Sequence, residues 1–176
     1  IASGVMVSSD TGSVSIASAT GRTSFVVNSG GSLSVGSFTV GGGNASLTSG
    51  GDTTLSKGTA SGEIGVNSGG NAALGTLTSG GSTIRATSDR GGLTFGTLKA
   101  ATGITLEAAR AWSQGNAISG TGLTVTRGTV DLLARAGNLT VGTLSVGSAL
   151  STPKSRLETR AGSIRVSRIT GLKASQ

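Results

Sequence analysis

The chain contains no cysteine and no histidine, and it has one proline, one tryptophan, three phenylalanines and no tyrosine. Without cysteine and histidine it can form neither a disulfide nor a thiolate or imidazole metal site, so we expect no metal and no cofactor. A single proline excludes a collagen triple helix. No apolar run approaches the ~18 residues of a membrane-spanning helix, so we expect no transmembrane segment.

Bulky and charged side chains are also scarce. Gly, Ser, Thr and Ala account for 104 of the 176 residues, and aromatic residues for 2%. A chain of this length normally fills a thick core with bulky side chains, so we do not expect a compact globule. Hydrophobic residues nevertheless make up 35% and charged residues only 12%, unlike the composition of disordered chains. These values favour a thin architecture of short apolar strands and many glycine turns.

The formal net charge of +7 lies in one half of the chain. Residues 89–176 hold eleven basic and four acidic residues, whereas residues 1–88 hold three of each. An anionic partner would therefore meet the C-terminal half. The alternative is that a neighbouring acidic segment of a longer chain balances this charge. Since the chain begins at Ile1 without a basic and apolar signal region, we interpret it as a segment of a longer rod.

A repeat runs through the sequence. Gly-Gly pairs begin at Gly30, Gly50, Gly69 and Gly91, which sets a period of about 20 residues. After each pair, apolar and polar residues alternate, and this period of two is typical of a β-strand. A second set of alternating segments follows on the return path, at 25–27, 45–47, 64–66, 84–86, 104–106, 130–132 and 157–159. The segment 104–112 has some helical character, but its alignment with this set favours a strand.

Two or three short strands in each repeat of roughly 19 to 25 residues predict an all-β fold, a parallel β-helix of about eight coils. We expect one β-helix over residues 1–176, with regular coils of period about 20 in 1–109 and more basic coils of period about 25 in 110–176. Two stretches, 110–122 and 146–155, are expected to be corner loops. The first contains Trp112, which could stack on a sugar, although we favour a role in filling a widened corner.

Within a coil, the pattern also predicts which side chains point inward. The step from Val35 to Phe38 is three positions, so Gly36 and its equivalents are expected to mark a bend that reverses the face. The side chains expected to form inward columns are Leu33, Val35, Leu74, Leu93, Phe95, Leu139, Val141, Ile164 and Val166. On the outside, Arg85 is expected to pair with Glu107 across neighbouring coils, and Asp131 with Arg156.

The runs Ala136-Gly137-Asn138-Leu139-Thr140-Val141-Gly142-Thr143-Leu144 and Ala161-Gly162-Ser163-Ile164-Arg165-Val166 resemble the haemagglutinin repeats of large two-partner-secretion exoproteins. These include the filamentous haemagglutinin and contact-dependent inhibition families, and the Asn-Ser-Gly-Gly repeats are similar to those of autotransporter adhesin passengers. The resemblance implies a right-handed parallel β-helix that an outer-membrane transporter exports to the cell surface of a Gram-negative bacterium. The Asn-Pro motifs of the secretion module are missing, so the resemblance is to a shaft segment.

Parallel β-helices also include polysaccharide lyases and hydrolases, which need clustered carboxylates. Asp52, Asp89 and Asp131 fall in different repeats, and no two acids lie within four residues, so we do not expect an enzyme. A second interpretation is a carbohydrate-binding or carbohydrate-processing module. Its candidate site is a strip for an anionic polysaccharide formed by Arg90, Arg110, Arg135 and Arg160, which follow one another at intervals of one repeat, beside Arg156, Arg165 and Arg168.

The other interpretation of these arginines is that they are solvated side chains splayed at a corner. Nucleic acid is a poor candidate partner, because the chain has few aromatic side chains on which bases could stack. The function that the sequence favours is a structural shaft segment of a secreted adhesin or contact-dependent exoprotein. Its expected partners are host or bacterial cell surfaces, an anionic polysaccharide and the flanking coils of the same chain.

Overall fold

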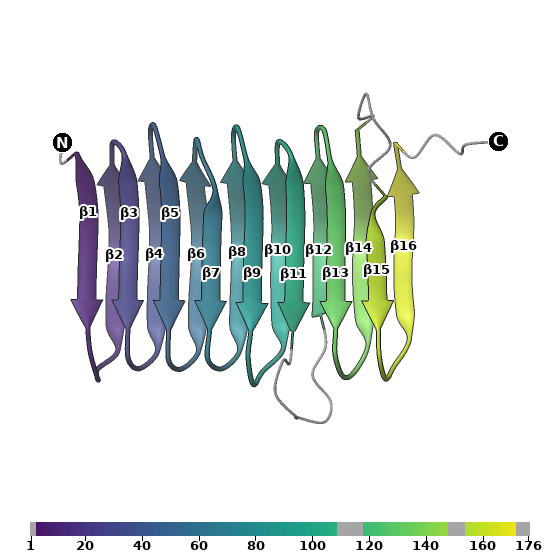
Figure 1. Cartoon of the computed structure of the whole chain (residues 1–176), viewed down its shortest axis with the longest axis horizontal. Helices are drawn as coiled ribbons and strands as arrows, with labels where there is room; N and C mark the ends of the chain where they lie inside the picture. The colour runs from purple at the N-terminus through teal and green to yellow at the C-terminus, as the bar shows by residue number, and fades with distance from the viewer. Residues whose placement is uncertain (1–2, 109–117, 148–153, 172–176) are drawn as a thin grey trace.

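The computed structural model describes residues 3–108, 118–147 and 154–171 of the chain. Within these residues every regular element is a β-strand, and none is a helix that could cross a membrane. The strands alternate between two parallel sheets, so that successive coils stack along one axis (Figure 1). This arrangement is a β-solenoid, and it confirms the expected all-β parallel architecture.

Each sheet contains eight strands, and successive strands of one sheet are spaced by one coil. Sheet A comprises β1 Gly4–Ser9, β3 Ser24–Ser29, β5 Asn44–Ser49, β7 Ile64–Ser68, β9 Thr83–Ser88, β11 Gly103–Ala108, β13 Thr129–Ala134 and β15 Arg156–Thr159. Sheet B comprises β2 Val14–Gly21, β4 Leu33–Val40, β6 Thr53–Ala60, β8 Ala72–Ser79, β10 Leu93–Ala100, β12 Ile118–Val125, β14 Leu139–Val146 and β16 Ile164–Thr170. The solenoid therefore makes about seven turns between its first and last strands, close to the eight coils expected.

The change of period in the second half arises in the connections and not in the strands. In sheet B the register pairs Leu93 with Ile118, Ile118 with Leu139, and Leu139 with Ile164, so the first and last of these steps are longer than the middle one. The two long steps include the segments 109–117 and 148–153, which lie outside the described residues together with Arg110, Trp112 and Pro153. The expected corner loop 110–122 is too long, because β12 already begins at Ile118.

The core lies between the two sheets and is built of stacked columns. Leu33, Val35, Leu74, Leu93, Phe95, Leu139 and Val141 are all buried, as the alternation predicts. The face also reverses at Gly36: the strand pairing goes from Ile16 with Val35 to Ser18 with Ser37 and omits the residue between. The strand nevertheless continues through this point, so the expected corner is a bend within β4.

In the last coil the predicted columns hold, but the predicted burial does not. Ile164 is 45% exposed and Val166 is only partly buried, although Leu139 and Val141, their neighbours in the same columns, are buried. Their strand, β16, is paired only with β14, so nothing in the described structure covers its far side. Burial in a solenoid requires a neighbour on both sides, and the alternation of a strand contains no information about its neighbours.

Buried serine hydroxyls explain the Ser-Gly-Gly motif. Ser29, Ser49, Ser68 and Ser88 occupy one column at the ends of sheet A strands and are at most 5% exposed. Their hydroxyls donate to turn carbonyls, for example from Ser68 to Gly51 O at 3.0 Å and to Asn71 O at 2.8 Å. The residue after Ser49 must be glycine because there is no room for a side chain: a Cβ on Gly50 would lie 2.3 Å from the Gly30 carbonyl oxygen.

The terminal coils lead to a first prediction. Ile164 and Ile169 are 45% and 51% exposed, and β1, β2, β15 and β16 each leave one backbone edge without a strand partner in the described structure. Since apolar surface and open strand edges promote association, we expect this chain to associate end to end as its concentration rises. Sedimentation velocity would measure this association. The double variant Ile164→Lys with Ile169→Lys should weaken the association. The control, Thr39→Lys with Thr59→Lys on the outer surface, should not. A single monomeric species at every concentration would contradict the prediction.

Candidate functional site

The arginines of the predicted strip do not form one column. Arg135 and Arg160 are equivalent, because they follow the paired residues Ala134 and Thr159 and their N–H groups donate to Ala108 and Ala134, respectively. In the coil that contains Arg90, the equivalent N–H is that of Asp89, which donates to Ser68 at 2.9 Å. Arg90 therefore lies one residue later than the column of Arg135 and Arg160.

The remaining arginines of the strip are divided between the two sheets. Arg156 begins β15 in sheet A, on the same side of the solenoid as Arg135 and Arg160. Arg165 and Arg168 lie on β16 in sheet B, where they pair in register with Thr140 and Thr143. The six of these arginines that the structure describes therefore do not make one continuous surface, and Arg110 lies outside the described residues.

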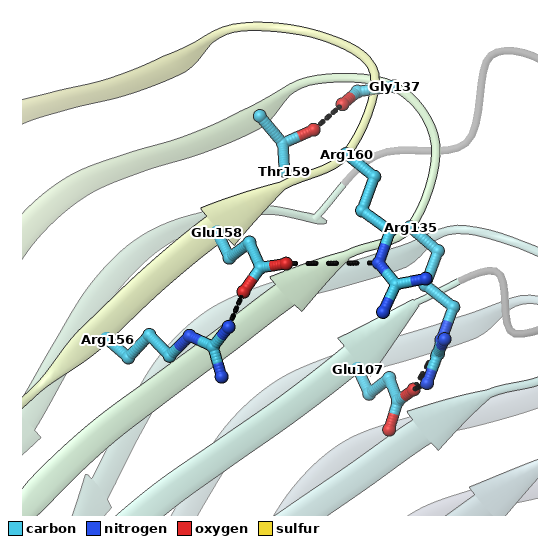
Figure 2. Close-up of polar contacts among 7 residues, drawn as sticks. All are labelled: Glu107, Arg135, Gly137, Arg156, Glu158, Thr159 and Arg160. Atoms are coloured by element: carbon cyan, nitrogen blue, oxygen red, sulfur yellow. Dashed lines mark hydrogen bonds and ion pairs between the residues drawn. The ribbon is translucent and has the colours of Figure 1, made fainter.

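Carboxylates lie against the arginines of sheet A (Figure 2). Arg135 Nη2 lies 2.6 Å from Glu107 Oε1, and its Nε donates to the same oxygen at 2.7 Å. Glu158 lies between two arginines: it contacts Arg156 Nη2, and its Oε1 is 3.8 Å from Arg160 Nε. Arg135 and Arg156 thus donate hydrogen bonds to carboxylates, and Arg160 shares the carboxylate of Glu158 as an ion pair.

The acidic residues of this region gather more closely than the sequence suggests. Glu107, Asp131 and Glu158 come from β11, β13 and β15 and together line a depression of about 310 Å³, with Arg156 beside them. These three acids do lie in different repeats, but the stacking of successive coils brings them to one depression, which their separation in the sequence does not show. Among the described residues, no group of three such side chains is placed to hold a metal ion.

The two predicted charge pairs have different outcomes. Asp131 lies directly opposite Arg156 in the register of β13 and β15, as expected, but the carboxylate that Arg156 contacts is that of Glu158. Arg85 lies opposite Thr105 instead of Glu107, and its Nε is 3.3 Å from Glu63 Oε1. The predicted pairing fails because the coil step from β9 to β11 is shorter than the separation of Arg85 and Glu107, so that Thr87 lies opposite Glu107.

A ladder of side-chain acceptors at the turns before sheet B was not anticipated. Asp52 Oδ1 accepts the N–H of Asn71 at 2.7 Å, and Asn71 Oδ1 in turn accepts the N–H of Gly92 at 3.0 Å. Asn138 Oδ1 accepts the N–H of Ser163 at 3.0 Å in the same way. The spacing of Asp and Asn before the alternating segments is the signal that could have identified this ladder. It fixes one coil to the next and leaves Asp52 in a structural role.

No family model, no curated protein and no solved structure matches this chain. Its function is therefore argued from its own residues.

Proposed function

We infer that this chain is a shaft segment of a secreted, surface-displayed adhesin or contact-dependent exoprotein. In this role it is a rigid spacer that presents adhesive or effector regions carried elsewhere. The proposal includes display outside the outer membrane of a Gram-negative bacterium after passage through a transporter. The resemblance of its repeats to haemagglutinin repeats supports this setting, and the geometry of the stack supports the mechanical role.

One observation carries the proposal: each strand pairs only with the equivalent strand of the preceding and following coils. Strands β4, β6 and β8, for example, pair in one continuous register that places Leu33, Thr53 and Ala72 in one column. Stability in such a stack is a sum over neighbouring coils, so whole coils can be added or removed without changing the rest. Length is then an adjustable property, as a spacer requires.

The test measures the length and stiffness of the rod. The chain has no native cysteine, so Ser15→Cys with Thr140→Cys provides two specific positions for spin labels. Both residues lie in one outward column of sheet B, six strand spacings apart. Pulsed electron double resonance should give one narrow distance, with Cα atoms about 29 Å apart at ~4.8 Å per strand.

Deleting residues 33–71 removes two whole coils, because Leu33 and Ala72 are equivalent. The variant should remain folded, and the Cα separation should shorten to about 19 Å with an equally narrow distribution. Deleting 33–61 instead would join Ser32 to Gly62, so that β7 of the wrong sheet follows the turn, and should prevent stacking. A broad distance distribution in the full chain, or unfolding after the in-phase deletion, would contradict a modular shaft.

A further inference from the structure

The outer surface of sheet B differs in charge from that of sheet A. The strands of sheet B contain four basic residues, Lys57, Lys99, Arg165 and Arg168, and no Asp or Glu. The acidic residues within strands, Glu107, Asp131 and Glu158, all belong to sheet A. The charge of the chain is therefore divided between its two faces as well as between its two halves.

The basic side chains of the two sheets also differ in their partners. On the side of sheet A, Arg85, Arg135, Arg156 and Arg160 each contact a glutamate. Lys57, Lys99, Arg165 and Arg168 are exposed and form no ion pair with any residue that the structure describes. Their charges are therefore available to a partner in solution, whereas the four arginines on the side of sheet A share three glutamates within the chain.

Hydroxyl groups fill the rest of this surface in columns that run across the strands. One column comprises Ser15, Ser34, Thr54, Ala73, Thr94, Ser119, Thr140 and Arg165. A second comprises Ser18, Ser37, Lys57, Thr76, Thr97, Gly122, Thr143 and Arg168, and a third Thr20, Thr39, Thr59, Thr78, Lys99, Thr124, Ser145 and Thr170. All four basic residues thus lie within the hydroxyl columns.

The hydroxyls of the third column face solvent. Thr39 and Thr59 are exposed, Thr78 is half-buried, and none of the three makes a side-chain hydrogen bond within the described part of the chain. Each hydroxyl can both donate and accept, and neighbouring members of a column are about 4.8 Å apart along the solenoid. The three columns together therefore present at least one hydroxyl at every coil.

We propose that the outer surface of sheet B binds an extended anionic polysaccharide that lies across the strands. Its carboxylate or sulfate groups would pair with Lys57, Lys99, Arg165 and Arg168, and its sugar hydroxyls would bond the Ser and Thr columns. A sugar unit is comparable in length with the strand spacing, so successive units meet successive coils. Nucleic acid fits less well, because Phe25, Phe38 and Phe95 are buried and offer no surface on which bases could stack.

The experiment compares two variants of the full chain that lose the same charge. The first changes Lys57, Lys99, Arg165 and Arg168 to Ser, and the second changes Arg85, Arg90, Arg156 and Arg160 to Ser. Both reduce the formal net charge from +7 by four, and all eight residues are exposed. Binding to polygalacturonate is measured by titration at two salt concentrations, with dextran as the neutral polymer and single-stranded DNA as the other polyanion. Circular dichroism checks that each variant is folded.

The first variant should bind polygalacturonate on the order of tenfold more weakly than the native chain, and the second should bind nearly as well as the native chain. Equal losses in both variants would overturn the proposal and leave unspecific attraction by net charge. Tighter binding to DNA than to polygalacturonate would also overturn it. These outcomes do not depend on the shaft proposal, which the distance measurement tests separately.

The hydroxyl columns have a test of their own. Thr39→Val, Thr59→Val and Thr78→Val together keep the shape and charge of the surface and remove three hydroxyls. This variant should bind polygalacturonate more weakly by a factor that persists at the higher salt concentration, since hydrogen bonds are screened less than exposed charges. Unchanged binding would show that the hydroxyls take no part and would overturn the polysaccharide assignment.

Discussion

Replacing Leu139 with Asp should destabilise the chain by roughly 4 kcal/mol or more, because it places a charge without a partner inside the stack. Leu139 is fully buried in β14, between Ile118 of the preceding coil and Ile164 of the following one. A carboxylate there has no basic side chain in its column and no access to water. Urea denaturation followed by circular dichroism would measure the loss.

Two controls distinguish burial from a general effect of aspartate. Thr140→Asp places the same side chain on the outer surface of the same strand and should change the free energy of unfolding by about 0.5 kcal/mol or less. Ile164→Asp occupies the same column as Leu139 in the uncovered last coil, where Ile164 is 45% exposed. It should cost much less than Leu139→Asp, and equal costs at the two positions would contradict the difference in burial between the two coils.

The alternation of apolar residues contains enough information to predict the strands and most of the core, because each strand must bury one face. It could not predict that Ile164 is exposed, since burial of that residue depends on a coil that would have to lie beyond it. The same local rule predicted the reversal at Gly36, where the step between inward residues changes from two to three. The local period therefore predicts which way a side chain points, whereas the coils stacked on either side of it determine whether it is buried.

The arginine strip shows what spacing alone cannot predict. Arg90, Arg135 and Arg160 are separated by roughly whole coils, but the two coil steps from β9 to β13 are together one residue longer than the separation of Arg90 and Arg135, so Arg90 lies one position away from the column. The number of residues between two arginines does not show where within a coil an extra residue is inserted. The charge difference between the sheets could have been predicted from the sequence, because it requires only that alternate segments be assigned to opposite sheets.

Complementary sizes at neighbouring core positions were also missed, and they give the last prediction. Phe38 lies directly beside Gly58 in one inward column, and the Phe38 ring stacks on Phe25 with ring centroids 5.2 Å apart. A Cβ on Gly58 would lie 2.3 Å from two atoms of the Phe38 ring. The same arrangement recurs where Gly120 follows Phe95, with a corresponding distance of 2.1 Å. A phenylalanine thus occupies the space that a side chain on the glycine of the next coil would need.

Phe38→Ala should therefore cost about 3–5 kcal/mol by opening a cavity, and Gly58→Leu should cost about 1–3 kcal/mol or more by overpacking against a ring that Phe25 holds in place. The double variant Phe38→Ala with Gly58→Leu restores the volume. Its loss of stability should be smaller than the sum of the two single losses by about 1–3 kcal/mol. Urea denaturation of the four proteins measures this coupling. Phe38→Ala combined with Gly120→Leu is the matched control, because Gly120 is in contact with Phe95 and lies three coils from Phe38's neighbour Gly58. That control should be additive, and additivity in the Phe38 and Gly58 pair as well would show that the two positions do not share one space.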